Sequence, residues 1–260
     1  MGTRSRTATE AASAVTQWSS AGAPMPRPSP IGIYELSLVL FLTVAVATGM
    51  WLRHDGLRQM GTADGALIGL GQITSLYATV VLLAMMLLTA RVPWIERVVG
   101  MDLLNHWHRW AAIVATALIG VHVVASTAGY AMAQDVGLVA QLDEFIAAWP
   151  DMVTAIVGTV LFLAVAATSA QVARRAMSYE LWWLIHLIGY AAVVLSFFHE
   201  LSTGVDLLHD PGARWFWIEI HVAVAACIVV VRWVEPAVRA GPHRLRIADL
   251  RSDSEVSVTV

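Results

Sequence analysis

The sequence is poor in cysteine and in charge. Its single cysteine, Cys227, cannot build a disulfide framework, a Cys-x-x-Cys redox motif or a thiolate metal site. Charged residues make up 13% of the 260 residues, whereas soluble domains carry about 25%. Residues 1–30 have no apolar run after the early arginines, so we expect no cleaved signal peptide there, but a disordered cytoplasmic tail. We expect no nucleic acid partner.

Apolar residues are abundant instead, at 58% of the chain, with a mean hydropathy of +0.67. Eleven tryptophans suit a protein of the lipid bilayer, because tryptophan concentrates at membrane interfaces. A backbone in hydrocarbon must satisfy its own hydrogen bonds, so each long apolar run is expected to be a helix. The sequence thus predicts an all-α membrane protein, a six-transmembrane-helix bundle. The expected helices are 33–52, 66–90, 106–131, 152–173, 179–201 and 213–234.

Arginines gather on one side of these six segments. Some precede the first segment and others surround the connection near residues 90–109. Arg174 and Arg175 lie in the connection after the fourth segment, and further arginines follow the last segment. The longest connection on the other side, 131–150, has three acidic residues and no Lys or Arg. The positive-inside rule therefore predicts a bacterial-type plasma membrane protein with both termini cytoplasmic. The partly amphipathic 131–150 connection is expected along the outer surface.

The C-terminal tail changes its periodicity. From His243 onward, apolar residues such as Leu245 and Ile247, and later Val256 and Val258, alternate with polar ones. A period of two predicts strands, and two strands alone do not make a stable sheet. We therefore expect a membrane domain at 31–238 and, at 239–260, a linker with the first strands of a truncated β domain. Either the chain is a fragment, or another polypeptide completes the sheet.

Four of the nine histidines form a pattern. His108 and His122 are fourteen residues apart in one segment, within about 40° of one helix face and about 21 Å along its axis. His186 and His199 are thirteen residues apart, about 20 Å, in another. Both segments run from inside to outside in the expected topology. The sequence therefore predicts an inner pair, His108 and His186, and an outer pair, His122 and His199.

Paired imidazoles from facing helices are the axial ligands that a six-coordinate haem iron requires. A structural zinc site gathers four ligands at one point, which pairs separated by most of the membrane do not. A lone histidine in a membrane more often hydrogen-bonds a neighbouring helix. One detail disagrees: thirteen residues rotate an ideal helix by about 220°, so His186 and His199 would not share a face. A distortion near Gly189 or two laterally offset haems would reconcile this.

The other histidines are expected to have ordinary roles. His106 is interpreted as an interfacial residue beside Trp107 and Trp110. For His221 we expect an interhelical hydrogen bond rather than a haem contact. His54 and His209 fall in external connections, where solvated side chains are expected.

The spacing of the paired histidines in a six-helix bundle resembles the ferric reductase and NADPH oxidase transmembrane superfamily. The junction ARVPWIERVVGMDLLNHWHRW, residues 90–110, also resembles that region of bacterial ferric-reductase-like proteins. The resemblance covers roughly residues 35–260. It implies two b-type haems on the four histidines, and a cytoplasmic FAD domain of the ferredoxin-reductase type, fed by NAD(P)H, after the sixth helix. The tail from His243 resembles the opening strand of that domain.

The chain departs from the superfamily at two positions. NADPH oxidases resemble one another in an arginine on the second helix and a further histidine one turn after the outer ligand; this chain has Gln72 and Ser126 there. That weakens an oxygen-reducing assignment. An ordinary interhelical contact is an equal interpretation for Gln72.

The leading hypothesis is electron transfer through two haems from a cytoplasmic flavin to ferric iron or oxygen outside. On this hypothesis the chain is the membrane portion of an NAD(P)H-dependent oxidoreductase, incomplete by itself, with the flavin domain in cis or in trans. Arg91, Arg109, Arg174 and Arg175 are candidates for propionate or flavin-domain contacts, and equally for positive-inside anchors. The alternative is a non-enzymatic cytochrome b subunit that exchanges electrons with quinone or a partner oxidoreductase. A haem-free transport bundle ranks last.

Overall fold

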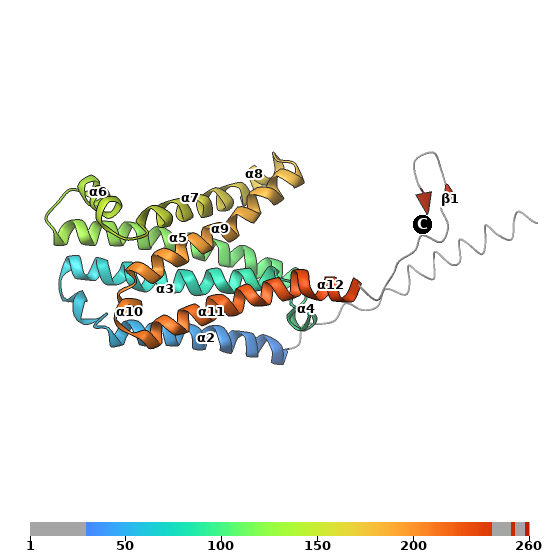
Figure 1. The fold of residues 1–260 in the computed structure, drawn as a ribbon, viewed down its shortest axis with the longest axis horizontal. Coiled ribbons are helices and arrows are strands. Elements are labelled where there is room, and N and C mark those ends of the chain that lie inside the picture. The colour runs from blue at the N-terminus through green and yellow to red at the C-terminus, as the bar shows by residue number, and fades with distance from the viewer. Residues whose placement is uncertain (1–29, 241–250, 253–257, 260) are drawn as a thin grey trace, which may run out of the picture.

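The computed structural model describes residues 30–240, 251–252 and 258–259. Six helices in it are long and apolar enough to cross a membrane, which confirms the predicted all-α, six-span architecture (Figure 1). They are α2 (Pro30–Arg53), α3 (Ala63–Thr89), α5 (Met101–Ala133), α7 (Met152–Ser169), α9 (Tyr179–Thr203) and α11 (Pro211–Val229). The sixth span continues from α11 through a π-helical turn, η2 (Val230–Val234), into α12 (Glu235–Ala240).

The fourth span ends earlier than its apolar run. The chain is extended at Ala170, with ψ at 141°, and then forms the short helix α8 (Gln171–Arg175). Other short helices lie between the spans. These are η1 (Arg58–Gly61), α4 (Pro93–Val99), α6 (Leu138–Ala148) and α10 (Val205–His209).

Helix α6 occupies the connection that was expected along the outer surface. Its amphipathic pattern buries Gln141 and Phe145 on one face. Phe145 meets Tyr130 and Trp149 edge to face, with ring centroids 5.6 and 5.0 Å apart. The amphipathic character read from the sequence therefore corresponds to a helix fastened to the end of α5 by aromatic packing.

Side-chain caps begin three of the helices. The Thr62 hydroxyl accepts a hydrogen bond from the Gly65 N–H at the start of α3, and the Ser178 hydroxyl accepts one from Leu181 at the start of α9. Asp210 accepts from two N–H groups of α11, whose first residue is Pro211. These side chains satisfy N–H groups that a helix start leaves without partners, and so fix where each span begins.

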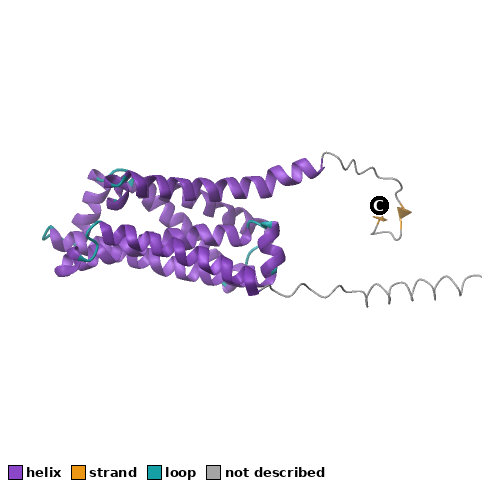
Figure 2. Ribbon diagram, turned by 90° about the horizontal axis from the view of Figure 1, so that it is seen from below, coloured by secondary structure: helices purple, strands orange, loops and turns teal. Residues whose placement is uncertain are grey.

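Helix α3 is the central element of the bundle. It packs against α2 and α11 on one side and against α5 along most of its length (Figure 1). Figure 2 shows the long helices running side by side as a bundle. Helices α7 and α9 form a second closely packed pair. A cluster of Leu82, Ala115, Phe162 and Ala192 joins the two groups through α3, α5, α7 and α9. Many other large apolar side chains of the spans are exposed, as expected for surfaces that contact lipid.

Two short strands pair near the C-terminus. They are β1 (Arg251–Ser252) and β2 (Val258–Thr259), antiparallel, with Arg251 opposite Thr259. Of the residues whose alternation predicted strands, Val258 lies in β2, and Leu245, Ile247 and Val256 lie outside the described residues, as do 1–29 of the predicted tail. Two-residue strands do not constitute a β domain.

Candidate functional site

The structure brings the inner pair of histidines together across two helices. The ring centroids of His108 on α5 and His186 on α9 are 6.0 Å apart, with their planes at 55°. A metal–imidazole bond is about 2 Å long, so two such bonds on opposite sides of one ion leave ring centroids roughly 6 Å apart. The separation is therefore the one that a shared ion requires. Trp182, one turn before His186, stacks on its ring at 4.8 Å.

The outer pair lies toward the other ends of the same two helices. His122 and His199 are about 21 and 20 Å along α5 and α9 from their inner partners. Helix α9 is α-helical without interruption from Tyr179 to Thr203, and Gly189 lies inside it. A distortion near Gly189 is therefore not what relates His186 to His199. The two histidines leave α9 in different directions, which favours offset sites.

Hydrogen bonds at Nδ1 prepare the α5 histidines for coordination through Nε2. The Nδ1–H of His108 donates to the Met85 carbonyl at 3.1 Å, and that of His122 donates to the Gly71 carbonyl at 2.9 Å. A carbonyl oxygen only accepts, so each Nδ1 must carry the proton and each Nε2 keeps its lone pair. Metal-bound histidines typically make this kind of second hydrogen bond.

The α9 histidines have hydroxyl partners, and on α5 the Ser126 Oγ also lies 3.5 Å from His122 Nδ1. Ser169 Oγ lies 3.3 Å from His186 Nδ1, and Thr203 Oγ1 lies 3.3 Å from both ring nitrogens of His199. All four imidazoles are partly buried. Partly buried imidazoles with bonded Nδ1 atoms are ligands of the kind that haem iron takes, and the inner pair also has a matching separation. Within the described part of the chain, no group of three or more His, Cys, Asp or Glu residues converges on one point.

The candidate arginines differ in environment. Arg174 on α8 lies over the Trp182 ring at 4.8 Å and over the Tyr179 ring at 5.9 Å, a pair of cation–π contacts. It therefore adjoins the inner histidine pair through Trp182. Arg91, Arg109 and Arg175 are exposed.

Three of the remaining histidines lie near helix ends or on an exposed surface. His106 is exposed and meets the Trp110 ring at 6.4 Å, as expected for an interfacial residue. His209 is exposed, and its Nδ1 donates to the Val205 carbonyl. His54 differs from the expected solvated side chain, because it is partly buried, its Nδ1 donates to the Met50 carbonyl, and its Nε2 lies 3.8 Å from Asp210.

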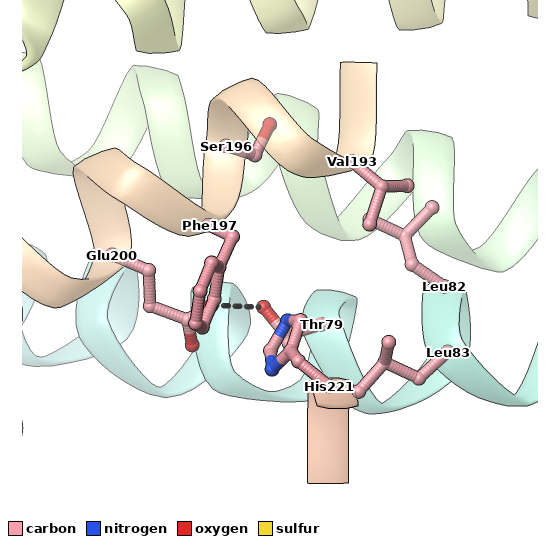
Figure 3. Close-up of a pocket in the computed structure, with 8 residues that line it drawn as sticks. All are labelled: Thr79, Leu82, Leu83, Val193, Ser196, Phe197, Glu200 and His221. Carbon is pink, nitrogen blue, oxygen red and sulfur yellow. Dashed lines mark hydrogen bonds between the residues drawn. The ribbon is translucent and has the colours of Figure 1, made fainter. Parts of the chain in front are cut away.

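Sequence reasoning missed a polar cluster between α3, α9 and α11. The Thr79 hydroxyl donates to Glu200 Oε2 at 3.2 Å, while Oε1 of the same carboxyl is buried without a hydrogen-bond partner among the described residues (Figure 3). His221 completes the cluster: its ring packs on Phe197 at 4.3 Å, and its Nδ1 donates to the Trp217 carbonyl. The hydrogen bond of His221 therefore stays within α11, whereas an interhelical bond was expected.

These residues line a cavity of ≈ 10 Å³, enough for about one water molecule. The signal for the cluster was available in the sequence. An acidic residue at the end of an apolar segment, next to His199, is itself unusual in a span. At the first of the two positions where the sequence departs from NADPH oxidases, the Gln72 side chain accepts a hydrogen bond from Gln59 of η1.

Comparison with known proteins identifies the central part of the chain. Residues 74–197 match the family described as ferric reductase like transmembrane component. No curated protein and no solved structure matches. The matched segment contains His108, His122 and His186 and ends two residues before His199. Residues 74–197, a little under half of the chain, are thus similar to ferric reductase like transmembrane components.

Proposed function

We propose that this chain carries electrons across a membrane through two b-type haems. His108 and His186 would hold the inner haem, and His122 and His199 the outer one. The observation that carries the proposal is the inner pair, whose imidazoles face each other from two helices at the separation a shared iron needs. The second pair, at nearly the same spacing along both helices, extends that arrangement across the bundle.

The chain's own residues would hold and insulate the redox groups. A haem iron accepts and releases one electron at a time, and its potential depends on ligands, hydrogen bonds and burial. The α5 and α9 imidazoles supply the ligands, and the Met85 and Gly71 carbonyls hold two of them in one tautomer. The buried cluster of Leu82, Ala115, Phe162 and Ala192 would make the surroundings apolar.

We further propose that the electrons come from a cytoplasmic flavin that NAD(P)H reduces, and pass to ferric iron or oxygen outside. Both chain termini would then face the cytoplasm. A flavin domain would be supplied in cis after the linker at 239–260 or in trans. Arg174 and Arg175 lie at the helix end that would face this donor, and Arg174 adjoins the inner pair through Trp182.

Haem quantification tests the proposal. We expect two b-type haems per chain after haem-replete expression, with reduced-minus-oxidised bands of low-spin haem. His122→Ala and His199→Ala should each lower the content toward one haem, because each removes one axial ligand. His106→Ala is the matched control, an exposed histidine on the same helix as His122. Unchanged haem content in both ligand variants would refute the assignment.

A further inference from the structure

Helix α3 provides a hydrogen-bond acceptor for each of the two α5 histidines. We propose that it is a positioning element, in which the carbonyls of Met85 and Gly71 fix the tautomer and direction of His108 and His122. We also propose that the contact with His122 depends on residue 71 being glycine, which has no Cβ. The inference rests on the proposed haem function and adds positioning residues to it.

The spacing of donors and acceptors supports this role. The two carbonyls are fourteen residues apart on α3, and the two histidines are fourteen residues apart on α5. The lower-numbered histidine meets the higher-numbered carbonyl, so the helices are antiparallel and the two contacts repeat with one period. Equal spacing on two closely packed helices places both contacts in register. The packing of α3 on α5 therefore fixes the direction and tautomer of both His108 and His122.

The α9 histidines are held differently. Their partners are hydroxyl oxygens at 3.3 Å. Ser169 Oγ can donate as well as accept, whereas the Thr203 hydroxyl donates to the His199 carbonyl at 2.7 Å and lies equally far from both ring nitrogens of His199. A hydroxyl therefore does not dictate which ring nitrogen carries the proton, whereas a carbonyl does. Each haem would thus have one ligand fixed by α3 and one held less strictly on α9.

The outer contact requires close approach of the two backbones. A Cβ on Gly71 would lie 2.2 Å from Ser126 Oγ and 3.1 Å from Ser126 N, so a larger residue requires the Ser126 side chain to turn away and the two backbones to separate by a few tenths of an ångström. Ser126 is one turn after His122 on the same helix. Any such displacement acts directly on the 2.9 Å bond between His122 Nδ1 and the Gly71 carbonyl.

The α3 carbonyl should also tune the outer haem. An imidazole that donates a hydrogen bond is a more basic ligand, and it favours ferric over ferrous iron. Weakening the bond to Gly71 should therefore raise the midpoint potential of the haem on His122. The haem on His108 should keep its potential, because Met85 lies about four turns away on α3.

Gly71→Ala tests the inference. We expect about 10–100-fold weaker binding of one haem of the two, as is typical when such a partner of a ligand is lost. Redox titration followed by absorbance should show a raised midpoint potential for that haem alone. Adding Ser126→Ala removes the nearest clashing atom and should restore part of both properties.

Gly120→Ala is the matched control, since a Cβ there meets nothing within 4 Å. If Gly71→Ala does not fold, Ser126→Cys replaces the Oγ that faces Gly71 by a larger sulfur atom. This variant should raise the midpoint potential of the same haem by a smaller amount. Equal effects on both haems, or no difference from Gly120→Ala, would overturn the role of α3. A wild-type protein without haem would instead refute the proposed function itself.

Discussion

At the scale of single residues, the candidate ligands can be found in the sequence, whereas their hydrogen-bond partners cannot. His108, His122, His186 and His199 stand out because ionisable residues are rare in apolar segments. Their partners do not stand out, because a main-chain carbonyl such as that of Met85 belongs to any residue. Only the packing of α3 on α5 reveals which carbonyl is used.

The buried carboxyl of Glu200 offers a residue-scale prediction. Thr79→Val removes the hydroxyl that donates to Oε2 and leaves both carboxyl oxygens without a partner among the described residues. We expect the free energy of unfolding to fall by about 1–3 kcal/mol, the typical penalty for an unsatisfied buried polar group. Thermal unfolding in detergent measures it.

Thr43→Val is the control for this change. Its hydroxyl is exposed and bonds only the Val39 carbonyl of its own helix, so little change is expected. Equal destabilisation by the two variants would show that the bond between Thr79 and Glu200 contributes nothing beyond general packing.

Asp210 gives a pH prediction at the other end of the bundle. Hydrogen bonds from the Ala213 and Gly212 N–H groups, with Arg53 and His54 nearby, hold the pKa of its carboxyl below the ordinary value of 3.8. A lowered native pKa stabilises the fold above 3.8, and this stabilisation is lost as the pH falls from 3.8 toward the native pKa.

Asp210→Asn keeps a capping oxygen but loses the charge. We expect the variant to be less stable than the wild type at neutral pH, and the difference to shrink once the pH falls below 3.8. Unfolding midpoints of both proteins across that range provide the measurement. A difference that does not depend on pH would contradict a role for the ionised carboxylate.

At the scale of elements, the apolar runs located every span, because length and hydropathy suffice for a membrane helix. The ends were harder to predict. The run at 152–173 continues past the break at Ala170, since the change there is in the backbone and not in hydropathy. Helix α6 was only partly foreseen, because one of the rings that Phe145 contacts, that of Tyr130, lies in the preceding span α5.

The regular geometry of α9 determines the angle between its two histidines. A regular helix with ligands thirteen residues apart presents them about 140° from each other. The sequence left a local distortion as an alternative, and the uninterrupted α9 excludes it. Sites on different sides of α9 follow from helix geometry alone.

At the scale of the whole molecule, orientation is the prediction that labelling can check. In a Cys227→Ala background, Arg175→Cys should react with an impermeant thiol reagent only from the cytoplasmic side of sealed vesicles. Leu138→Cys on α6 should react only from the outside. Both native residues are exposed, so accessibility does not limit either reaction. The reverse pattern would invert the proposed direction of electron flow.

The π-helical turn at Val230–Val234 has a consequence for everything that follows it. A π turn accommodates one more residue than an α turn, so the chain beyond it is rotated by about 100° from the phase of α11. The side chains of α12, including the ion-paired Glu235 and Arg239, therefore face a direction that an unbroken α-helix would not give them. The π turn therefore rotates α12 about the helix axis relative to α11. An insertion or deletion in this turn would change the direction in which the α12 side chains point as well as the length of the span. We therefore expect this stretch to tolerate such changes less well than its apolar composition suggests.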